Sequence, residues 1–590
     1  MMNGGVPVGI FKKLGWYFKQ EKKRYIIGVL ALVATALVNL IPPRVIGILA
    51  DLFDQGHLTG SAAWWWIGTL LTAGILQYLF RFAWRNMIWG GAAKLEKQLR
   101  SRLFWHFMQM DDTFFQRHRT GDLMAHATND LNAVQNVAGA GILTFADSII
   151  TGGSTLIAMM IFVDWRLTLV AIIPLPLLAV AARRLGMKLH AAFSESQAAF
   201  SRLNDKTQES VSGIKVIKTF GQDKEDVADF NRIVDRTINI NKRVNRIDSL
   251  FDPVTSIIIG ATYVIAIIYG GTLVNAGTIT IGSLISFVAY VNALVWPMFA
   301  IGRLFNVIER GNASYDRVHE LLQEKSEVVN KPHALTTLSH SNIDYALDSF
   351  TYPGSDKVTL QDIHFDLPEG HQLGIVGRVG AGKTTIIKLL LREFDHYDGV
   401  IKIGGRDIRD YTLEALHNAI GYVPQDNFLF STDVRNNIRF SAYDKDQPAV
   451  EAAAKTSAIH DDILQFADQY DTLVGEKGVS LSGGQKQRLS IARAVITEPD
   501  ILIMDDALSA VDAKTEEQIL EGLQADRQDK TTIIVAQRLS SVMHADEILV
   551  VDDGRITERG THDQLLADNG WYAEMWSEQQ LTQSLERSDA

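Results

Sequence analysis

Long apolar runs alternate with charged stretches through the first half of the chain, up to about Ile308. A helix that crosses a membrane needs roughly 20 mostly apolar residues. Six runs approach this length, at Tyr25–Ile48, Ala62–Phe82, Gly139–Val163, Leu167–Ala182, Val254–Val274 and Ile281–Phe305. The pattern therefore predicts an all-α transmembrane domain of six helices, which we place at residues 1–320, with a lipid bilayer around it.

Lys and Arg are distributed unevenly among the segments that join these runs. Residues 51–62 and 275–280 contain neither, whereas the segments between the second and third runs and between the fourth and fifth runs are long and rich in both. Basic residues favour the cytoplasmic side of a membrane. We therefore expect a multi-pass membrane protein whose two termini and two long segments are cytoplasmic.

The two long segments have a helical pattern, so we expect each to extend a transmembrane helix into the cytoplasm and back. Within them, Arg119–Met124 and Thr207–Gly213 place a glycine among polar residues, which suits a turn or a short connecting helix. Such turns can dock on a cytoplasmic domain of the same protein. The alternative is that they are ordinary solvated loops.

Two features inside the apolar runs bear on transport. Asp147 lies in the third run, and charges inside a membrane are costly and usually face a cavity or a partner. It can line a pathway for cationic substrates, serve as a hydrogen-bonded packing residue, or lie just below the bilayer. Prolines interrupt the backbone hydrogen bonds of a helix. They predict kinks at Pro42, Pro43, Pro174, Pro176 and Pro297.

Composition excludes several classes of function. The formal charge of -11 and the lack of a basic stripe argue against nucleic acid as a partner. The absence of cysteine excludes disulfides, thiol chemistry and cysteine metal sites. The basic residues near the N-terminus precede an apolar run that is too long for a signal peptide, so we expect no cleavable signal.

The second half of the chain has the composition of a soluble domain. Residues 321–341 are polar and irregular and are predicted to form a linker. Alternating apolar and polar residues at Ile343–Tyr352 and Leu360–Leu367 then predict β-strands. We expect an α/β P-loop nucleotide-binding domain at residues 342–575 and a C-terminal tail at residues 576–590.

The segment from Gly377 to Thr384 fits the P-loop pattern, with glycines at Gly377, Gly380 and Gly382. It follows the apolar strand Gln372–Val376 and precedes a helical run that begins at Thr385, which is the context that a phosphate cradle requires. Glycines let backbone N–H groups approach the phosphates at a helix N-terminus. Lys383 would reach the β- and γ-phosphates of ATP, and Thr384 would hold Mg²⁺.

Two further motifs follow in the order that an ATPase requires. The apolar strand Ile501–Met504 delivers Asp505 to its C-terminal end, where it can assist Mg²⁺, and Asp506 follows in a position to meet the attacking water. Between the P-loop and this strand lies the string Leu481–Gln485. Its residues Ser482, Gly483, Gly484 and Gln485 would offer a hydroxyl and close backbone access to an anion.

The string at Leu481–Gln485 resembles the signature motif of the ABC transporter family, and the resemblance extends over nearly the whole chain. Six spans before one nucleotide-binding domain look like a half-size exporter of the lipid-A or multidrug type. The resemblance implies that Tyr352 stacks on adenine, that Gln425 contacts Mg²⁺ and the membrane domain, and that Ser509–Asp512 is the D-loop. The stretches Arg119–Asp130 and Asn306–Ser314 look most like one chain of bacterial heterodimeric multidrug pumps.

The resemblance therefore predicts ATP and Mg²⁺ as cofactors. The residues expected at ATP are Tyr352, Gly377, Gly380, Gly382, Lys383, Thr384, Thr385, Ser482, Gly483, Gly484 and Gln485. The residues expected at the metal are Thr384, Gln425 and Asp505.

Two positions depart from the family pattern. Where the family usually has the glutamate that polarises the attacking water, this chain has Asp506, whose carboxylate is withdrawn by about 1.5 Å, and a misplacement of about 1 Å can cost on the order of 10²-fold in rate. Where the family has a histidine near the γ-phosphate, this chain has Gln537, which cannot become cationic. Together with Gln425, these are the residues expected at the catalytic step, and they predict a site that turns over ATP slowly.

In this family two nucleotide-binding domains pair head to tail, so that each ATP lies between one P-loop and the other chain's signature. A homodimer of this chain would have two weak sites. We therefore expect a heterodimer with a second half-transporter that carries Glu and His, with most hydrolysis at the site that the partner's Walker motifs complete. The expected activity is efflux of hydrophobic or cationic small molecules. The alternatives are a lipid or peptide exporter and a non-transporting, ATP-gated regulatory subunit.

Overall fold

The computed structural model describes residues 9–475, 478 and 481–589, so residues 1–8, 476–477, 479–480 and 590 of the predicted domains lie outside the described residues. The chain divides into two compact units. The first contains Met1–Met108 and Thr120–Glu324, and the second contains Gln109–Arg119 and Lys325–Ala590. The short segment Gln109–Arg119 therefore belongs to the second unit, although both of its flanks belong to the first.

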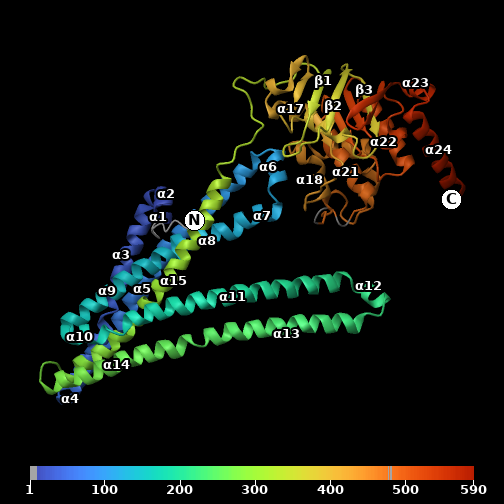
Figure 1. Ribbon diagram of the computed structural model, residues 1–590. Coiled ribbons are helices and arrows are strands. Elements are labelled where there is room, and N and C mark those ends of the chain that lie inside the picture. The colour runs from blue at the N-terminus through green and yellow to red at the C-terminus, as the bar shows by residue number, and fades with distance from the viewer. Residues whose placement is uncertain (1–8, 476–477, 479–480, 590) are drawn as a thin grey trace. The chain divides into compact units, whose positions relative to one another are not determined.

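The first unit is helical (Figure 1). Two π-helical turns, η1 (His126–Asp130) and η2 (Val137–Gly141), interrupt its third long helical stretch. Its α-helices are α1 (Gly9–Lys13), α2 (Gly15–Gln20), α3 (Lys22–Val38), α4 (Ile41–Asp54), α5 (Gly60–Met108), α7 (Thr120–Ala125), α8 (Leu131–Asn136), α9 (Ile142–Phe162), α10 (Trp165–Ile172), α11 (Leu175–Ser212), α12 (Ile214–Thr219), α13 (Asp223–Asp248), α14 (Phe251–Asn275) and α15 (Ile281–Leu321).

Proline acts in two ways in these helices. Pro42 and Pro43 lie in the first turn of α4, and Pro176 lies in the first turn of α11, where Pro174 is the N-cap. At these places one helix ends and another begins, because proline lacks the N–H that would continue the hydrogen bonding. Pro297 lies inside α15 and does not end that helix.

Five helical stretches of the described chain are long and apolar enough to cross a membrane: Lys22–Asp54, Thr120–Phe162, Trp165–Ser212, Asp223–Asn275 and Ile281–Met298. Each contains most of one predicted run. The remaining run, Ala62–Phe82, lies in α5, whose tryptophans and Gln77 lower the mean hydropathy of that segment. Large apolar side chains on α5 are nevertheless exposed, including Trp64 at 74% and Trp65 at 72%, as expected for a surface that faces lipid.

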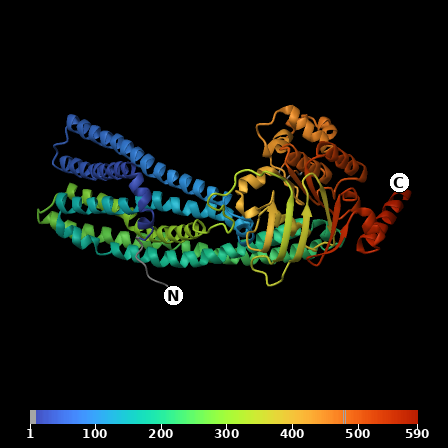
Figure 2. The ribbon, with the colours of Figure 1, turned by 90° about the horizontal axis from the view of Figure 1, so that it is seen from above.

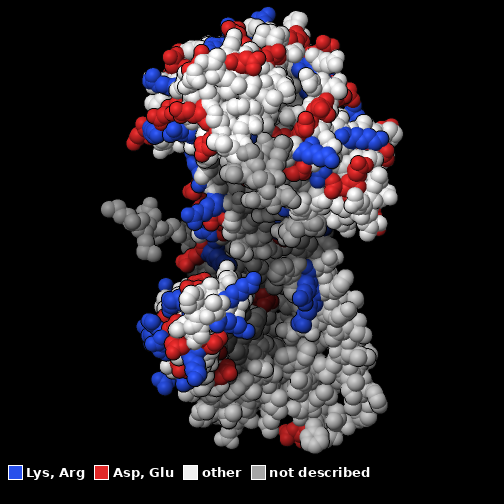
Figure 3. All heavy atoms as spheres, turned by 90° about the vertical axis from the view of Figure 1, so that its right-hand side faces the viewer, with Lys and Arg blue, Asp and Glu red and all other residues white. Residues whose placement is uncertain are grey.

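Two helices of the first unit form a long antiparallel hairpin. In Figures 1 and 2, α11 and α13 (both green) run side by side and are joined through α12. At 38 residues, α11 is about 57 Å long, which exceeds the roughly 30 Å hydrocarbon core of a bilayer. Figure 3 shows Lys, Arg, Asp and Glu mixed at the end of this hairpin. There Lys206 forms an ion pair with Asp226 at 2.6 Å.

The second unit contains two sheets. The first sheet is antiparallel and has the order β2-β1-β4-β5, and the second has the order β10-β9-β3-β8-β7-β6. In the second sheet β9, β3, β8, β7 and β6 are parallel, and β10 pairs antiparallel with β9. The strands are β1 (Ile343–Phe350), β2 (Leu360–Leu367), β3 (Gln372–Gly377), β4 (Asp398–Ile403), β5 (Arg406–Asp407), β6 (Ile420–Val423), β7 (Ile501–Asp505), β8 (Thr531–Val535), β9 (Glu547–Asp552) and β10 (Arg555–Gly560).

Three apolar cores hold the second unit together. One fills the space around the antiparallel sheet and one face of the parallel sheet, and a second covers the other face beneath α22 and α24. A third joins α18 to α21. The helices are α6 (Asp112–Arg117), α16 (Lys383–Leu390), α17 (Leu413–Ala419), α18 (Val434–Ile438), α19 (Gln447–Thr456), α20 (His460–Gln465), α21 (Gly483–Val495), α22 (Ala513–Asp526), α23 (His562–Ala567) and α24 (Trp571–Asp589).

Candidate nucleotide-binding site

The parallel strands of the second unit bring most of the predicted site residues to one edge of the sheet. The P-loop follows β3, and Asp506 follows β7 directly. Gln425 comes two residues after β6, and Gln537 comes two residues after β8. Because β3, β8, β7 and β6 are neighbours and parallel, their carboxyl ends meet. Open parallel sheets bind ligands at this edge.

Glycine is required in the P-loop for a steric reason. Gly377 has a φ of 145°, and a Cβ there would lie 2.0 Å from the carbonyl oxygen of Val551 on β9. Lys383, the first residue of α16, donates from Nζ to the carbonyl oxygens of Gly377 at 2.8 Å and Arg378 at 2.9 Å. The loop therefore wraps around a positive charge at a helix N-terminus, which is a setting for phosphate. Burial lowers the pKa of Lys383, and the charge of Asp506 opposes that shift.

Thr384 and Asp505 form a set of oxygen atoms that fits Mg²⁺. The Thr384 hydroxyl donates to Oδ1 of Asp505 at 3.2 Å. Asp505 is 1% exposed, and its buried Oδ2 has no hydrogen-bond partner within the described part of the chain. A buried carboxylate oxygen without a partner is costly unless a cation satisfies it. Burial raises the pKa of Asp505, and so does the neighbouring Asp506 charge.

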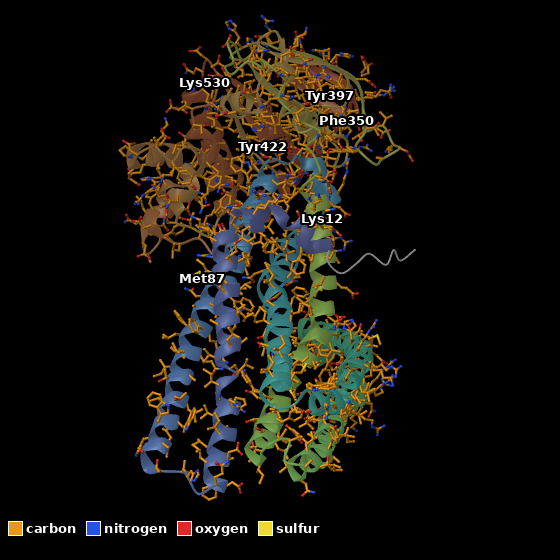
Figure 4. All side chains as sticks on the ribbon, turned by 90° about the vertical axis from the view of Figure 1, so that its left-hand side faces the viewer. Lys12, Met87, Phe350, Tyr397, Tyr422 and Lys530 are labelled. Carbon is orange, nitrogen blue, oxygen red and sulfur yellow. The ribbon has the colours of Figure 1, made fainter. Side chains whose placement is uncertain are left out.

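Tyr422 on β6 borders this carboxylate from the next strand. Burial, followed by the charge of Asp505, raises the pKa of Tyr422, so this residue presents a neutral hydroxyl near the predicted metal position. Figure 4 labels Tyr422 in the second unit. The sequence reasoning did not assign Tyr422 a role, because a tyrosine in a strand carries no motif.

Asp506 is held by the two glutamines that the sequence placed at the catalytic step. Its Oδ2 accepts hydrogen bonds from Gln537 Nε2 at 3.1 Å and from Gln425 Nε2 at 3.4 Å. Its backbone N–H donates to Val535 at 2.8 Å, and its φ of 51° lies in the left-handed region. Such a conformation is easier for Asp than for most residues with a side chain. Burial raises the pKa of Asp506, and the charge of Lys383 lowers it.

Tyr352 and Thr385 meet at the other side of the P-loop helix. The Tyr352 hydroxyl and Thr385 Oγ1 are 3.0 Å apart. The Tyr352 ring packs edge-to-face against Phe394 and Phe350, with centroids 5.4 Å and 5.0 Å away. The structure thus places the predicted adenine-stacking residue beside α16, on a fixed aromatic base.

The signature residues belong to a different cluster. Ser482 and Gln485 form a reciprocal capping box at the start of α21, and the Gln485 amide also donates to Asp462 at 3.3 Å. A Cβ on Gly484 would lie 2.9 Å from the carbonyl oxygen of Ala510, so glycine permits the close approach of α21 to the loop after β7. The hydrogen bonds of Ser482 and Gln485 thus stay within this region and do not lead to the P-loop.

Gln487, which no motif singled out, joins α21 to the loop that the resemblance identifies as the D-loop. It is 4% exposed. Its Nε2 donates to Ser509 Oγ at 3.0 Å, and its Oε1 accepts the N–H of Ala510 at 2.9 Å. The only feature of the sequence that could have pointed to Gln487 is its position on a helix, two residues after the string Leu481–Gln485.

The segment Gln109–Arg119 also brings unpredicted residues to the P-loop helix. Asp111 caps α6 by accepting from Phe114 N at 3.0 Å, and its other oxygen accepts from Ser326 Oγ at 2.9 Å. Asp112 forms an ion pair with Lys388 of α16 at 3.3 Å. The segment that the structure groups with the second unit thus ends at Arg119, the first residue of the predicted docking stretch Arg119–Met124.

In the first unit, Asp147 lies on α9 and is half-buried. Its Oδ1 accepts a hydrogen bond from Thr151, one turn later on the same helix, at 2.7 Å. This contact satisfies one oxygen of the carboxylate locally.

Comparison with known proteins identifies relatives for both units. Residues 25–298 match the family model described as ABC transporter transmembrane region, and residues 360–509 match the model described as ABC transporter. The chain is 44% identical over 572 residues to the probable multidrug resistance ABC transporter ATP-binding/permease protein YheI of Bacillus subtilis (strain 168), covering 97% of this chain and 98% of YheI. It is 41% identical over 577 residues to the multidrug resistance-like ATP-binding protein MdlA of Escherichia coli (strain K12), covering 98% of each.

A solved structure has the same architecture. It is a bacterial Atm1-family ABC exporter with ATP bound, which is 26% identical and matches with a TM-score of 0.77 over 95% of this chain and 98% of that chain. The predicted fold class, a helical transmembrane domain followed by an α/β nucleotide-binding domain, is therefore confirmed.

Proposed function

The chain belongs to the ABC transporter family, as an exporter with one transmembrane domain and one ATP-hydrolysing domain, and we propose that it is the catalytically weaker subunit of a heterodimeric multidrug pump. The proposed activity is the ATP-driven export of hydrophobic, amphipathic or cationic compounds across a bacterial plasma membrane. The names of the relatives YheI and MdlA support the multidrug class. The basic segments between the apolar runs support cytoplasmic termini and a cytoplasmic ATP-binding domain.

In the proposed site, this chain binds ATP through its P-loop. The N–H groups of the loop and the ammonium of Lys383 hold the phosphates. Thr384 and Asp505 would hold Mg²⁺, with Gln425 as the third predicted ligand, and the ion would supply positive charge beside the phosphates. Tyr352 supplies a flat face for the adenine ring.

The observation that carries the proposal of a weak site is the arrangement at Asp506. A water that attacks the γ-phosphate needs a carboxylate to orient it, and the aspartate side chain is one methylene shorter than the usual glutamate. Two amides, Gln425 and Gln537, already bind one of its two oxygens. An amide at position 537 can hydrogen-bond a phosphate but cannot carry a positive charge. We infer that this site holds ATP and hydrolyses it slowly.

The signature of this chain serves the partner's ATP. Ser482 and the following glycines are intact, and the capping box fixes the N-terminus of α21, where an anion is stabilised. In a head-to-tail pair these groups complete the site formed by the partner's Walker motifs. If the partner carries glutamate and histidine at the equivalent positions, one site of the pair is fast and the other is slow.

The first experiment compares the purified chain alone with the chain co-expressed with a half-transporter that carries Glu and His. The pair should show drug-stimulated ATPase and transport into inverted vesicles, and the lone chain should show little of either. Robust ATPase and transport by the lone chain would refute the heterodimer.

The second experiment substitutes one carboxylate at a time in the pair. Asp506→Gln should leave most of the ATPase intact, because this site contributes little to turnover. The matching Glu→Gln substitution in the partner is the control and should abolish most of the activity. Near-complete loss with Asp506→Gln would contradict the assignment of the slow site.

The substrate class is tested by comparing dyes, lipids and peptides in the same vesicles. Uptake of cationic and neutral dyes supports a multidrug pump, and uptake of lipids or peptides alone supports the alternative exporters. ATP binding without any transport in the pair would instead support a regulatory subunit.

A further inference from the structure

The C-terminal helix α24 is anchored firmly where it begins. The Glu558 carboxylate of β10 accepts the N–H groups of Trp571 at 2.6 Å and of Tyr572 at 3.2 Å. Tyr572 is fully buried, and its hydroxyl lies 2.7 Å from Nδ1 of His562 on α23. A Cβ on Gly570 would lie 2.3 Å from the Glu558 carboxylate, so the backbone at Gly570 lies close to this side chain. The start of α24 is therefore fixed to the sheet.

The same face of α24 continues toward the ATP site. Trp571, Met575 and Trp576 pack on the core that covers the parallel sheet. Residues seven apart in a helix lie two turns apart on one face, so Gln579 follows Tyr572 on the packed side. The helix thus carries the Gln579 amide to a position set by its anchored first turn.

Gln579 brackets the segment that carries Gln537. Its Nε2 donates to the carbonyl oxygen of Gln537 at 3.0 Å, and its Oε1 accepts the N–H of Leu539 at 3.0 Å. Leu539 begins a 3₁₀ turn, η7 (Leu539–Ser541), whose N-cap residue Arg538 makes no side-chain capping bond. One side chain from the C-terminal helix therefore fixes the backbone on both sides of Arg538.

The segment that Gln579 fixes includes Gln537, which contacts the predicted catalytic carboxylate. Gln537 donates to Oδ2 of Asp506 at 3.1 Å. The negative charge of Asp506 in turn opposes the lowering of the Lys383 pKa by burial. The contacts form one continuous path from α24 through Gln579 and Gln537 to Asp506.

We propose that Gln579 is a positioning residue of the ATP site, through which the C-terminal helix holds Gln537 against Asp506 and the terminal phosphate of ATP. This inference rests on the proposed role of the P-loop site in binding ATP, and it is independent of the heterodimer. It makes α24 part of the device that distinguishes ATP from ADP, because only ATP has the phosphate that reaches Gln537.

The test measures equilibrium binding of ATP and ADP, with Mg²⁺ and on ice, to the full-length chain and its variants in nanodiscs. In Gln579→Ala the preference for ATP over ADP should fall by roughly three- to tenfold, the effect of losing one or two hydrogen bonds. ADP affinity should be unchanged. Gln580→Ala is the matched control, because Gln580 is the neighbouring residue of the same type and is exposed.

A second arm asks whether Gln579 acts through Gln537. In a Gln537→Ala background, Gln579→Ala should cause little further loss of the ATP preference, because the group that Gln579 positions is absent. Additive losses would overturn the proposed path.

The outcomes distinguish a failure of the proposed role of Gln579 from a failure of the proposed ATP site. If the wild-type chain prefers ATP over ADP and Gln579→Ala keeps that preference, the inference fails and the ATP site stands. Equal losses for ATP and ADP in Gln579→Ala, or an equal effect of Gln580→Ala, also overturn it. If the wild-type chain binds ATP and ADP equally, the inference fails and the ATP site stands. If the wild-type chain binds neither nucleotide, the proposed ATP site fails, and the inference fails with it.

Discussion

Replacing Gln487 by leucine removes the side chain that joins the signature helix α21 to the loop after β7. Leucine preserves the approximate volume and the helix but can neither donate nor accept a hydrogen bond. In the wild-type chain the Gln487 amide donates to Ser509 Oγ and accepts from the N–H of Ala510. The substitution therefore separates the polar link from the packing.

The two lost bonds have different costs. Ser509 Oγ also donates to the Asp506 carbonyl at 3.0 Å, so it keeps a partner when Gln487 is replaced. Loss of the hydrogen bond between Gln487 and Ser509 therefore costs about 0.5–1.5 kcal/mol. The Ala510 N–H loses its acceptor, which costs about 1–3 kcal/mol. We expect the loop to open more easily by about 1.5–4.5 kcal/mol in total, which corresponds to about 10- to 1,600-fold faster exchange of the Ala510 amide.

Hydrogen exchange read by mass spectrometry on peptides that cover residues 506–512 measures this change directly. Gln524→Leu makes the same chemical change at an exposed position of α22 and should leave the exchange unaltered. Unchanged protection of the loop in Gln487→Leu would refute the reasoning, because it would mean that packing alone holds the loop to α21.

Three further perturbations test other parts of the second unit. Gly377→Ala places a Cβ 2.0 Å from the Val551 carbonyl oxygen, so we expect loss of fluorescent-nucleotide binding and a lower Tm; normal binding would contradict the steric argument. Asp505→Asn should make ATP affinity nearly insensitive to EDTA, and a persistent EDTA effect would rule out Asp505 as the main metal ligand. Burial raises the pKa of Asp111, but four hydrogen bonds outweigh it and hold that pKa below its usual 3.8. Its contribution to stability is therefore present above pH 3.8 and is lost as the pH falls through the lowered pKa. At neutral pH, Asp111→Asn should speed hydrogen exchange of the linker amides of Glu327 and Val328, which donate to Asp111. Equal exchange in both proteins would show that Asp111 does not hold these amides.

Local pattern predicted several elements of the fold. The apolar runs predicted helices because a helix in lipid satisfies its own backbone hydrogen bonds and needs only length and apolar side chains. The run in α5 was recognised despite the tryptophans that lower its mean hydropathy. In the second unit, the strand before Gly377 and the helix after it were predicted from neighbouring residues alone.

The effects of the prolines show where local pattern stops. The sequence predicted a kink at each proline, but the structure ends one helix and begins another at Pro42–Pro43 and at Pro174–Pro176, and it continues α15 through Pro297. A proline inside a helix removes a backbone hydrogen bond, whereas a proline in the first turn removes none, because that N–H has no partner within the helix. Whether the helix ends there depends on the packing around it.

By itself the sequence predicted the chemistry of the site, because each motif lies in consecutive residues: the P-loop cradle, Asp505 after its strand, and the Ser482 hydroxyl followed by two glycines. It also identified Asp506 and Gln537 as departures. Only the tertiary structure decided that these two residues bind each other, and that Gln487 and Gln579 fix the loops around them. Such contacts join parts of the chain that are 22 to 42 residues apart, and no periodicity records them. They exist because parallel strands bring their carboxyl ends to one edge and packed helices carry amides to that edge.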